Sequence, residues 1–162
     1  GHRRISNRLA FAGILAGSRR GGARLRVARD GGEVVGVSIA FEPGDWPLPE
    51  ASVIWELGWL GVAGPLPASR GMRNDRAMRA LHPTYPHMYL WFLGVDPSRH
   101  GSGIGRALLA ELHADAAHLG VPTYLETGTP GNVPFYEGDG YEVLGEIEMP
   151  VGPRMWRMER AG

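Results

Sequence analysis

Three glycines at alternate positions separate an apolar run from a helical pattern in the stretch LWFLGVDPSRHGSGIGRALLAEL, residues 90–112. These glycines, Gly101, Gly103 and Gly105, permit a backbone path that turns successive N–H groups toward one point. The helix that follows adds its own unpaired N–H groups and the positive end of its dipole. The stretch is therefore a candidate anion site, typical of phosphate binding, although a glycine-rich surface loop can also bind nothing.

Two familiar phosphate loops do not fit this stretch. A nucleotide-triphosphate loop needs a lysine after its last glycine, but the 17 basic residues of the chain are all arginine. A dinucleotide-binding turn needs GxGxxG directly after a strand. Here residues 96–100 come between the apolar run and the glycines, and position 106 is Arg. If the loop binds a phosphate, the ligand is therefore expected to be neither a nucleotide triphosphate nor a dinucleotide.

The elements around the loop follow from periodicity and turn residues. The spacing predicts a helix from Gly103 to Leu119 that ends at Gly120, and the continuous apolar run from Tyr89 to Val95 predicts a buried strand. A hairpin is expected from Leu25 to Phe41 around the turn Asp30-Gly31-Gly32. We also expect helices over Ile5–Ala16, Ser52–Leu60 and Ser69–Leu81, a helical turn at Pro134–Glu137, and strands over Thr123–Thr127, Tyr141–Glu148 and Met155–Glu159.

Two motifs at the proper separation resemble the GCN5-related N-acetyltransferases (GNAT). Their acetyl-CoA loop has Gln or Arg, two residues, Gly, one residue, then Gly or Ala, after a strand ending in Val-x-Pro; here His100, Gly103 and Gly105 take these places. Downstream, VPTYLETGTPGNVPFYEGDGYEV resembles the family's fifth strand, its Asn-containing loop and its Tyr-x-x-x-Gly-Phe segment, with Tyr141 replacing Phe. With the closing GPRMWRM, it is particularly similar to the branch that includes puromycin N-acetyltransferase.

The resemblance implies an α/β (α+β) fold: a mixed, mostly antiparallel central sheet with helices on both faces and a splayed fourth strand. We expect residues 1–162 to form a single acetyltransferase-like domain that lacks the family's first strand and helix, which help to build the acceptor site. Three explanations stay open: the sequence begins inside the domain, the elements were removed, or the protein is a shortened member.

Acetyl-CoA is the cosubstrate that the resemblance implies. Leu93, Gly94 and Val95 match the bulged strand that binds the pantetheine arm and points an N–H at the thioester oxygen, and Gly94 would ease its irregular backbone. The pyrophosphate would be held by the loop and the start of its helix, that is, by His100, Gly101, Ser102, Gly103, Ile104, Gly105 and Arg106. Arg99 or Arg106 could supply a positive charge that the loop otherwise lacks.

Two catalytic roles, a general acid and a general base, have candidate residues. Tyr136 matches the family's general acid, which protonates the departing thiolate, and it would also contact the cofactor. Asn132 would orient the cofactor or the tyrosine, or it merely closes the turn before it. Glu126 is the first candidate for the base that takes the amine proton, but it could equally hold a backbone or arginine partner. His87 is the second candidate.

The remaining features set limits on partners. We expect His113 and His118, five residues apart on a helix, to face solvent, and we expect no metal site. The formal charge is zero and the N-terminal arginines suit a solvated face, so no nucleic-acid partner is expected. No apolar run spans a bilayer and no signal peptide is evident, which predicts a cytoplasmic protein without a membrane partner. The terminal strand pair, with Trp55 and Trp59, makes a homodimer an open possibility.

The sequence therefore predicts an N-acetyltransferase that moves acetyl from acetyl-CoA to an amine of a small-molecule acceptor, by direct attack in a ternary complex. The competing interpretation is a non-catalytic acyl-CoA-binding or regulatory domain of the same fold. The identity of the acceptor is beyond the sequence.

Overall fold

The computed structural model of the chain describes residues 22–46, 73–74 and 76–162. The helices expected over Ile5–Ala16 and Ser52–Leu60, and with them Trp55 and Trp59, lie outside the described residues.

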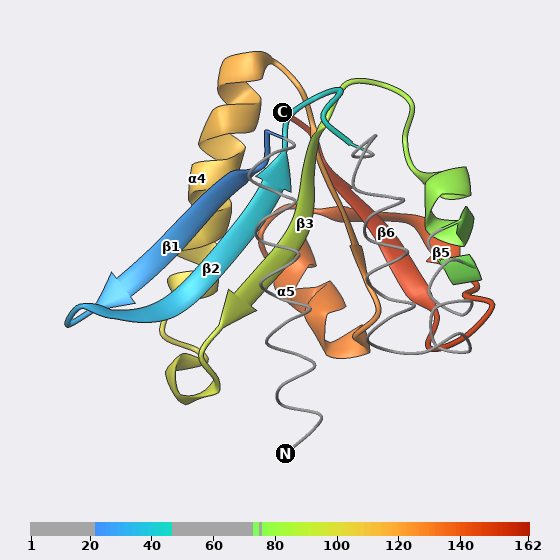
Figure 1. The fold of residues 1–162 in the computed structure, drawn as a ribbon. Coiled ribbons are helices and arrows are strands. Elements are labelled where there is room, and N and C mark those ends of the chain that lie inside the picture. Colours follow the sequence, from blue (N-terminus) through green and yellow to red (C-terminus); the bar gives the residue numbers. More distant parts are fainter. Residues whose placement is uncertain (1–21, 47–72, 75) are drawn as a thin grey trace, which may run out of the picture.

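Six strands form one twisted sheet in the order β1-β2-β3-β4-β6-β5 (Figure 1). Neighbouring strands are antiparallel except for β3 and β4, which are parallel. This arrangement confirms the mixed, mostly antiparallel sheet that the sequence predicts. The strand bounds are β1 Arg24–Asp30, β2 Glu33–Phe41, β3 Met88–Val95, β4 Thr123–Thr127, β5 Glu142–Ile147 and β6 Met155–Arg160.

The predicted helix after the glycine loop is confirmed as α4, Ile104–Leu119. It begins after Gly103 and ends before Gly120, and both glycines have left-handed backbone angles, with φ of 84° and 68°. The predicted helical turn is α5, Val133–Glu137, which follows a 3-10 turn, η2, Pro130–Asn132. Another 3-10 turn, η1, spans Pro97–Arg99, and residues 76–81 confirm the second half of the helix expected over Ser69–Leu81.

The two faces of the sheet bury different side chains. Because side chains alternate along a strand, Leu90 and Leu125 point to the face covered by α4, where they pack in a core cluster with Leu109 and Leu112. Tyr89 and Tyr124 point to the opposite face and form an aromatic cluster. The same alternation places Glu126 on the aromatic face, and the site depends on this.

Beyond Leu90, β3 and β4 separate. Their parallel pairing covers only Met88 to Leu90 against Thr123 to Leu125, although β3 continues to Val95. We call the opening between the two strands the β3/β4 fork; α5 lies below it in Figure 1. The fork is the splay expected of the family's fourth strand.

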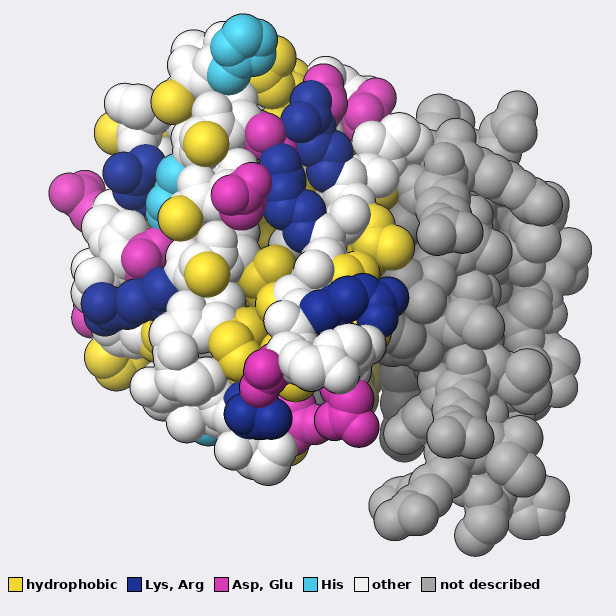
Figure 2. Space-filling view, turned by 90° about the vertical axis from the view of Figure 1, so that its left-hand side faces the viewer, with side chains coloured by type: hydrophobic (Ala, Val, Ile, Leu, Met, Phe, Trp, Pro, Cys, Tyr) yellow, Lys and Arg dark blue, Asp and Glu magenta, His cyan; other side chains and the backbone are white. Residues whose placement is uncertain are grey.

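The face of β1 and α4 carries arginines interleaved with acidic side chains (Figure 2). Arg24 forms ion pairs with Glu42, at 2.5 Å, and with Asp115, at 3.1 Å, and Arg26 lies 2.5 Å from the same Asp115 carboxylate. These described arginines stabilise the contact between β1 and α4, so their charge is largely balanced within the chain. In the described part of the chain, no helix is long and apolar enough to cross a membrane.

Candidate active site

The loop between β3 and α4 is anchored at its start by Asp96. The Asp96 N–H donates to the carbonyl of Val35, at 2.9 Å, where β2 bulges opposite β1. The Asp96 carboxylate accepts from the Ser98 N–H, at 2.8 Å, and from the Ser98 hydroxyl, at 2.6 Å, and these two bonds lower its pKa. The five residues that separate the strand from the glycines therefore form one capped turn, η1.

Five backbone N–H groups of the glycine loop and the first turn of α4 make no hydrogen bond within the described chain: Gly101, Gly103, Ile104, Gly105 and Arg106. The first turn of any helix leaves its N–H groups without intrahelical acceptors. At Gly103, no side chain caps them. The φ angles of Gly101 and Gly103 are 79° and 84°, and a Cβ added at either would meet nothing within 4 Å. The arrangement can therefore hold an anion by backbone groups alone.

The side chains of this loop are already engaged inside the protein. The His100 Nε2 donates to the Val95 carbonyl at 3.2 Å, and the Ser102 hydroxyl donates to the Arg99 carbonyl at 2.5 Å. Arg99 forms an ion pair with Asp30, at 2.8 Å, and the Arg106 guanidinium lies against Gly138. The backbone N–H groups of His100 and Ser102 also donate within the loop. Cofactor contacts by these two residues stay predictions.

The segment Leu93 to Val95 borders the fork. It pairs on one side with β2, in the register Leu93 with Ser38 and Val95 with Gly36, and its other edge has no strand partner in the described chain. The expected bulge is present, but it lies at Trp91, between the pairs Ile39 with Phe92 and Ala40 with Leu90. The prediction that Gly94 eases the irregular backbone is wrong, since Gly94 pairs in regular register and lies outside the left-handed region.

Tyr136 lies on α5 in the core cluster of the α4 face and is only 7% exposed. Its ring meets those of Phe135 and Tyr141 edge to face, with centroids 5.1 Å and 5.6 Å away. Burial raises the pKa of Tyr136 to about 12, because ionisation would place a charge in an apolar surrounding. The phenol thus keeps its proton at neutral pH. Gly105 helps to set this position, since a Cβ there would come within 3.2 Å of Phe135.

Asn132 contacts the end of β4. Its side-chain amide donates to the Thr127 hydroxyl at 3.3 Å, and its backbone N–H donates to the Thr129 carbonyl at 2.9 Å. These bonds close the turn that leads from β4 into α5. Through this turn Asn132 fixes where α5 begins.

Glu126 follows Leu125, the last residue of β4 that pairs with β3, and so lies at the apex of the fork. Its side chain is 1% exposed, and its Oε1 lies 3.3 Å from the Nδ1 of His82. No donor reaches Glu126 Oε2 with hydrogen-bond geometry in the described part of the chain. The Tyr124 hydroxyl is close to the same carboxylate, and burial together with that negative charge raises the Tyr124 pKa. The partner of Glu126 is thus a histidine.

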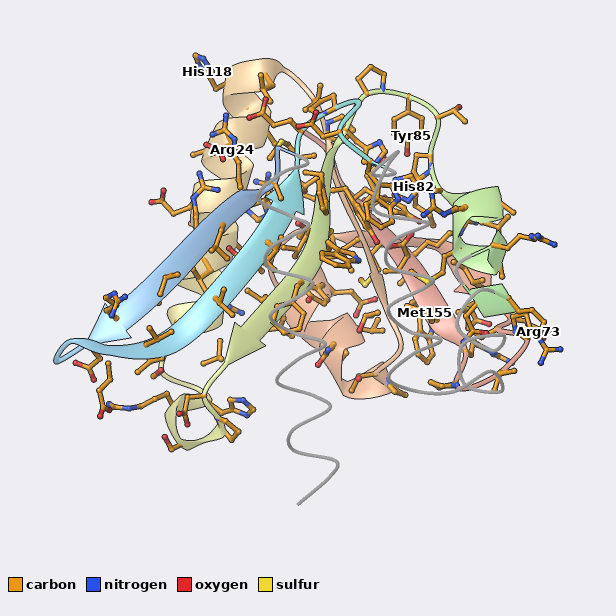
Figure 3. The ribbon with its side chains drawn as sticks, viewed as in Figure 1. Arg24, Arg73, His82, Tyr85, His118 and Met155 are labelled. Carbon is orange, nitrogen blue, oxygen red and sulfur yellow. The ribbon has the colours of Figure 1, made fainter. Side chains whose placement is uncertain are left out.

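His82 and His87 form a second pair, with their Nε2 atoms 3.1 Å apart. His87 is buried and its Nδ1 donates to the Tyr85 carbonyl at 2.7 Å. Burial lowers the pKa of His87, because the charged imidazolium would lose its hydration. His82 and Tyr85 lie near each other in Figure 3, whereas His118 projects from the far end of α4.

Sequence reasoning missed His82, because its partner Glu126 is 44 residues away. The segment HPTYPH, with a histidine and a proline at each end, is the signal that could have drawn attention to it. One further expectation is wrong. His113 does not face solvent, since its Nε2 lies 3.3 Å from the Tyr141 hydroxyl and 3.6 Å from an Asp139 carboxylate oxygen. His118 is exposed, as expected.

A pocket of about 580 Å³ opens beside the histidine pair. One wall comes from the end of β2 and the residues after it, and the other from the segment that leads into β3. Aromatic rings dominate: Trp46 and Tyr89 lie with their centroids 5.1 Å apart, and the Arg79 guanidinium is 5.5 Å from the Trp46 ring centroid. The lining includes Glu42, Trp46, Arg79, His82, His87 and Tyr89. The pocket is thus bordered by both histidines, and Glu126 lies behind His82, outside the lining.

Comparison with known proteins gives a consistent result. A family model described as the acetyltransferase (GNAT) family matches residues 12–141. A crystal structure from Corynebacterium glutamicum, described as histone acetyltransferase HPA2 and related acetyltransferase, is similar with a TM-score of 0.62 and 26% identity. That similarity covers 86% of this chain and 65% of the other. The chain thus spans less than two thirds of that protein's length.

Two more distant structures share the fold. The ribosomal-protein-alanine N-acetyltransferase from Brucella melitensis has a TM-score of 0.58 at 20% identity, over 92% of this chain and 75% of that one. Naa20 from Chaetomium thermophilum, solved with a bisubstrate analogue, has a TM-score of 0.56 at 18% identity, over 85% of this chain and 65% of that one. None of these comparisons confirms the puromycin N-acetyltransferase branch.

Proposed function

The chain belongs to the acetyltransferase (GNAT) family, and we propose that it transfers acetyl from acetyl-CoA to the amine of a small-molecule acceptor, by direct attack in a ternary complex. The observation that carries this proposal is the fork between β3 and β4, which has the N-terminal end of α4 on one side and a buried carboxylate at its apex. This arrangement supports a path on which the backbone N–H groups would hold the pyrophosphate, the strand edge would hold the pantetheine arm, and the carboxylate would take a proton.

The cofactor half fits a pyrophosphate with backbone groups. The N–H groups of Gly101 and of Gly103 to Arg106 have no acceptor within the described chain, and the helix dipole favours negative charge at this end. No Cβ at Gly101 or Gly103 stands in the way of a close approach. When bound, acetyl-CoA supplies the thioester from which the acetyl group passes to the amine.

The edge of Leu93 to Val95 that has no strand partner among the described residues suits the pantetheine arm and the thioester. An unpaired strand edge offers N–H and C=O groups at regular spacing, which can bond the amide groups of an extended ligand. An N–H aimed at the carbonyl oxygen would stabilise the negative charge that develops there. We assign this role to the segment as a whole.

Tyr136 is proposed as the general acid. Its phenol is buried beside the fork and stays protonated at neutral pH, since its pKa is raised to about 12. As the carbon–sulfur bond breaks, the proton on the phenol oxygen passes to the sulfur. The cost of forming a buried phenolate is met only while that proton is shared, so Tyr136 must be close to the sulfur when the bond breaks.

Glu126 is proposed as the group that takes the proton from the acceptor amine. Its buried Oε2 lacks a donor in the described chain, and leaving a buried carboxylate oxygen unpaired costs about 1–3 kcal/mol or more. An amine N–H would satisfy that oxygen and, in doing so, would be placed at the apex of the fork.

A compact acceptor suits the pocket beside His82. Its volume of about 580 Å³ is within the range of small-molecule sites, and Trp46 and Tyr89 offer apolar walls. Several structurally similar proteins are described as acting on proteins, so a peptide N-terminus is the acceptor class to test against it.

The test is release of CoA thiol with a panel of amines: aliphatic and aromatic small amines, polyamines, aminoglycosides and short peptides with free N-termini. We expect release that depends on a small amine and exceeds that with any peptide. Tight acetyl-CoA binding without CoA release for any amine would make the protein a non-catalytic acyl-CoA-binding domain. Preference for peptides would keep the acetyltransferase and overturn the small-molecule acceptor.

A further inference from the structure

The Glu126, His82 and His87 side chains form a chain of three hydrogen bonds whose two ends both accept. At one end the Tyr85 carbonyl faces His87 Nδ1, at 2.7 Å, and at the other the Glu126 Oε1 faces His82 Nδ1, at 3.3 Å. The link between them joins the two Nε2 atoms, at 3.1 Å. Neither a carbonyl nor a carboxylate oxygen can donate. The protons of these three hydrogen bonds must therefore belong to the two imidazoles, or one of them must be an additional proton bound from solution.

Counting protons gives the protonation state of this chain of hydrogen bonds. Three hydrogen bonds need three protons, but two neutral imidazoles carry only two. The His87 Nδ1 proton must point to the Tyr85 carbonyl, so a neutral His87 presents a lone pair at Nε2. His82 must then donate through its own Nε2, which leaves the bond between His82 Nδ1 and Glu126 Oε1 without a proton. If all three hydrogen bonds are formed, one extra proton lies in the bond between His82 Nδ1 and Glu126 Oε1.

The location of the extra proton follows from burial. His87 is buried deeply enough that its pKa is lowered, which keeps it neutral. Both histidines line the pocket, and His82, at 11% exposure, is the imidazole in contact with Glu126. Glu126, at 1% exposure, does not line the pocket, so the amine end of an acceptor would have to reach Oε2 from the fork. The extra proton is therefore shared between Glu126 and His82, and the pair is neutral overall.

Other charged and titratable groups face this unit from each neighbouring element. From β4 comes Tyr124, and from β6 come Arg157 and Glu159, of which Glu159 accepts a hydrogen bond from the Tyr85 hydroxyl. Arg157 lies opposite Glu126 in the strand register, but its Nη1 donates to the Leu81 carbonyl at 3.1 Å. Since Arg157 is directed toward Leu81, His82 is the cation-forming group in hydrogen-bond contact with Glu126.

We propose that Glu126 and His82 form a proton relay for the acetyl transfer, in which Glu126 Oε2 takes the amine proton, His82 receives a proton from Oε1, and His87 positions His82. The proposal rests on the proposed function. The N–H bond of the acceptor breaks as an O–H bond forms at Oε2. The proton shared at Oε1 becomes bound to His82 Nδ1. Both imidazolium N–H groups are then hydrogen-bonded, so one of them must leave its partner and pass its proton to water in the pocket, which restores the starting number of protons.

Because His82 would carry the proton and His87 would only position His82, substitutions of the two histidines should have different effects. His82 carries the proton, so His82→Asn should lower kcat by about 100-fold or more, as loss of acid–base catalysis does. The KM for acetyl-CoA should stay within about threefold. Toward His82, His87 acts only as an acceptor at its Nε2, so the amide oxygen of His87→Gln should retain most activity. His87→Leu removes that acceptor and should lower kcat by about 10-fold. His118→Asn, exposed on α4, is the control and should match the parent.

A second measurement does not depend on activity. Nitrogen-15 NMR of the imidazoles should find one proton on His87 at Nδ1, and a proton in the bond between His82 and Glu126 that disappears from His82 Nδ1 in Glu126→Gln. An Nε2-protonated His87, or a His82 spectrum unchanged by Glu126→Gln, would overturn the relay. So would a parent-like kcat in a folded His82→Asn variant. A parent protein that releases no CoA with any amine would instead overturn the proposed function, while the NMR result would still decide the proton count.

Discussion

The two sides of the β3/β4 fork are built in different ways. The proposed cofactor side is a continuous segment, residues 96–106, whose backbone N–H groups at the start of α4 would bind the ligand. The proposed acceptor side consists of side chains from separate segments, with His82 bonded to Glu126 across 44 positions of the sequence. A site made of backbone is fixed by its local sequence, whereas a site made of side chains depends on which segments the fold brings together.

Substitutions on the two sides should therefore affect different steps. Changes at the glycine loop should weaken cofactor binding. Changes in the Glu126 and His82 pair should slow turnover and leave cofactor binding unchanged. A variant that changed acetyl-CoA affinity and kcat by the same factor would show that the two sides do not act separately.

The largest effect is expected for Glu126→Gln. The amide keeps the size of the side chain but cannot take a proton, so kcat should fall by about 100- to 10,000-fold. Acetyl-CoA affinity, measured by calorimetry, should stay within about threefold of the parent value. A loss of affinity with unchanged kcat would make Glu126 a binding residue of the cofactor side.

Tyr136→Phe should lower kcat by about 100-fold, because the ring still packs in the core but no longer carries an acidic proton. The temperature midpoint of unfolding should stay close to that of the parent, which separates chemistry from packing. If the variant instead bound acetyl-CoA poorly and turned over normally, Tyr136 would serve binding alone.

Gly103→Ala should reduce acetyl-CoA affinity by about 10-fold, since its Cβ projects into the open space of the loop where the pyrophosphate is proposed to lie. The left-handed backbone, with φ of 84°, costs a non-glycine residue about 1–2 kcal/mol of stability. Gly120→Ala is the matched control, because Gly120 also has a left-handed backbone, with φ of 68°, and ends the same helix. Both variants should lose similar stability, and only Gly103→Ala should lose affinity. Equal affinity in the two variants would contradict the assignment of the loop.

The smallest effect concerns pH and stability. The pKa of His87 lies below its ordinary value of 6.5, mainly because of burial, so below pH 6.5 the unfolded chain binds a proton more readily than the folded chain. The free energy of unfolding should hold its full value above that pH and fall as the pH drops through the folded pKa. Urea unfolding at several pH values should show a shallower fall for His87→Gln than for His118→Gln. An identical fall in the two variants would place His87 in contact with water.

The strands, α4 and the glycine loop follow from the sequence because short-range patterns determine them. The stripe of Leu108 and Leu112, the stop at Gly120 and the turn at Asp30 to Gly32 each specify a local structure, and each is confirmed. The fork is implied by resemblance to a family and is visible in the three-residue pairing of β3 with β4.

The acceptor side was only partly accessible to sequence reasoning. Glu126 is recognisable by its place at the end of a strand, but its choice of His82 over an arginine or a backbone partner depends on the path of residues 82–87 over the aromatic face. The bulge at Trp91 and the inward turn of His113 toward Tyr141 are tertiary effects of the same kind. Neither leaves a mark in residue spacing.

The central claim is that acetyl-CoA and the amine bind at the fork at the same time. Its most direct test is the initial rate of CoA release, measured at several concentrations of acetyl-CoA and of one accepted amine. If both substrates must be present together, double-reciprocal plots should intersect, and no CoA should appear without amine. Parallel lines, with CoA released before the amine is added and acetyl left on the protein, would contradict direct attack in a ternary complex.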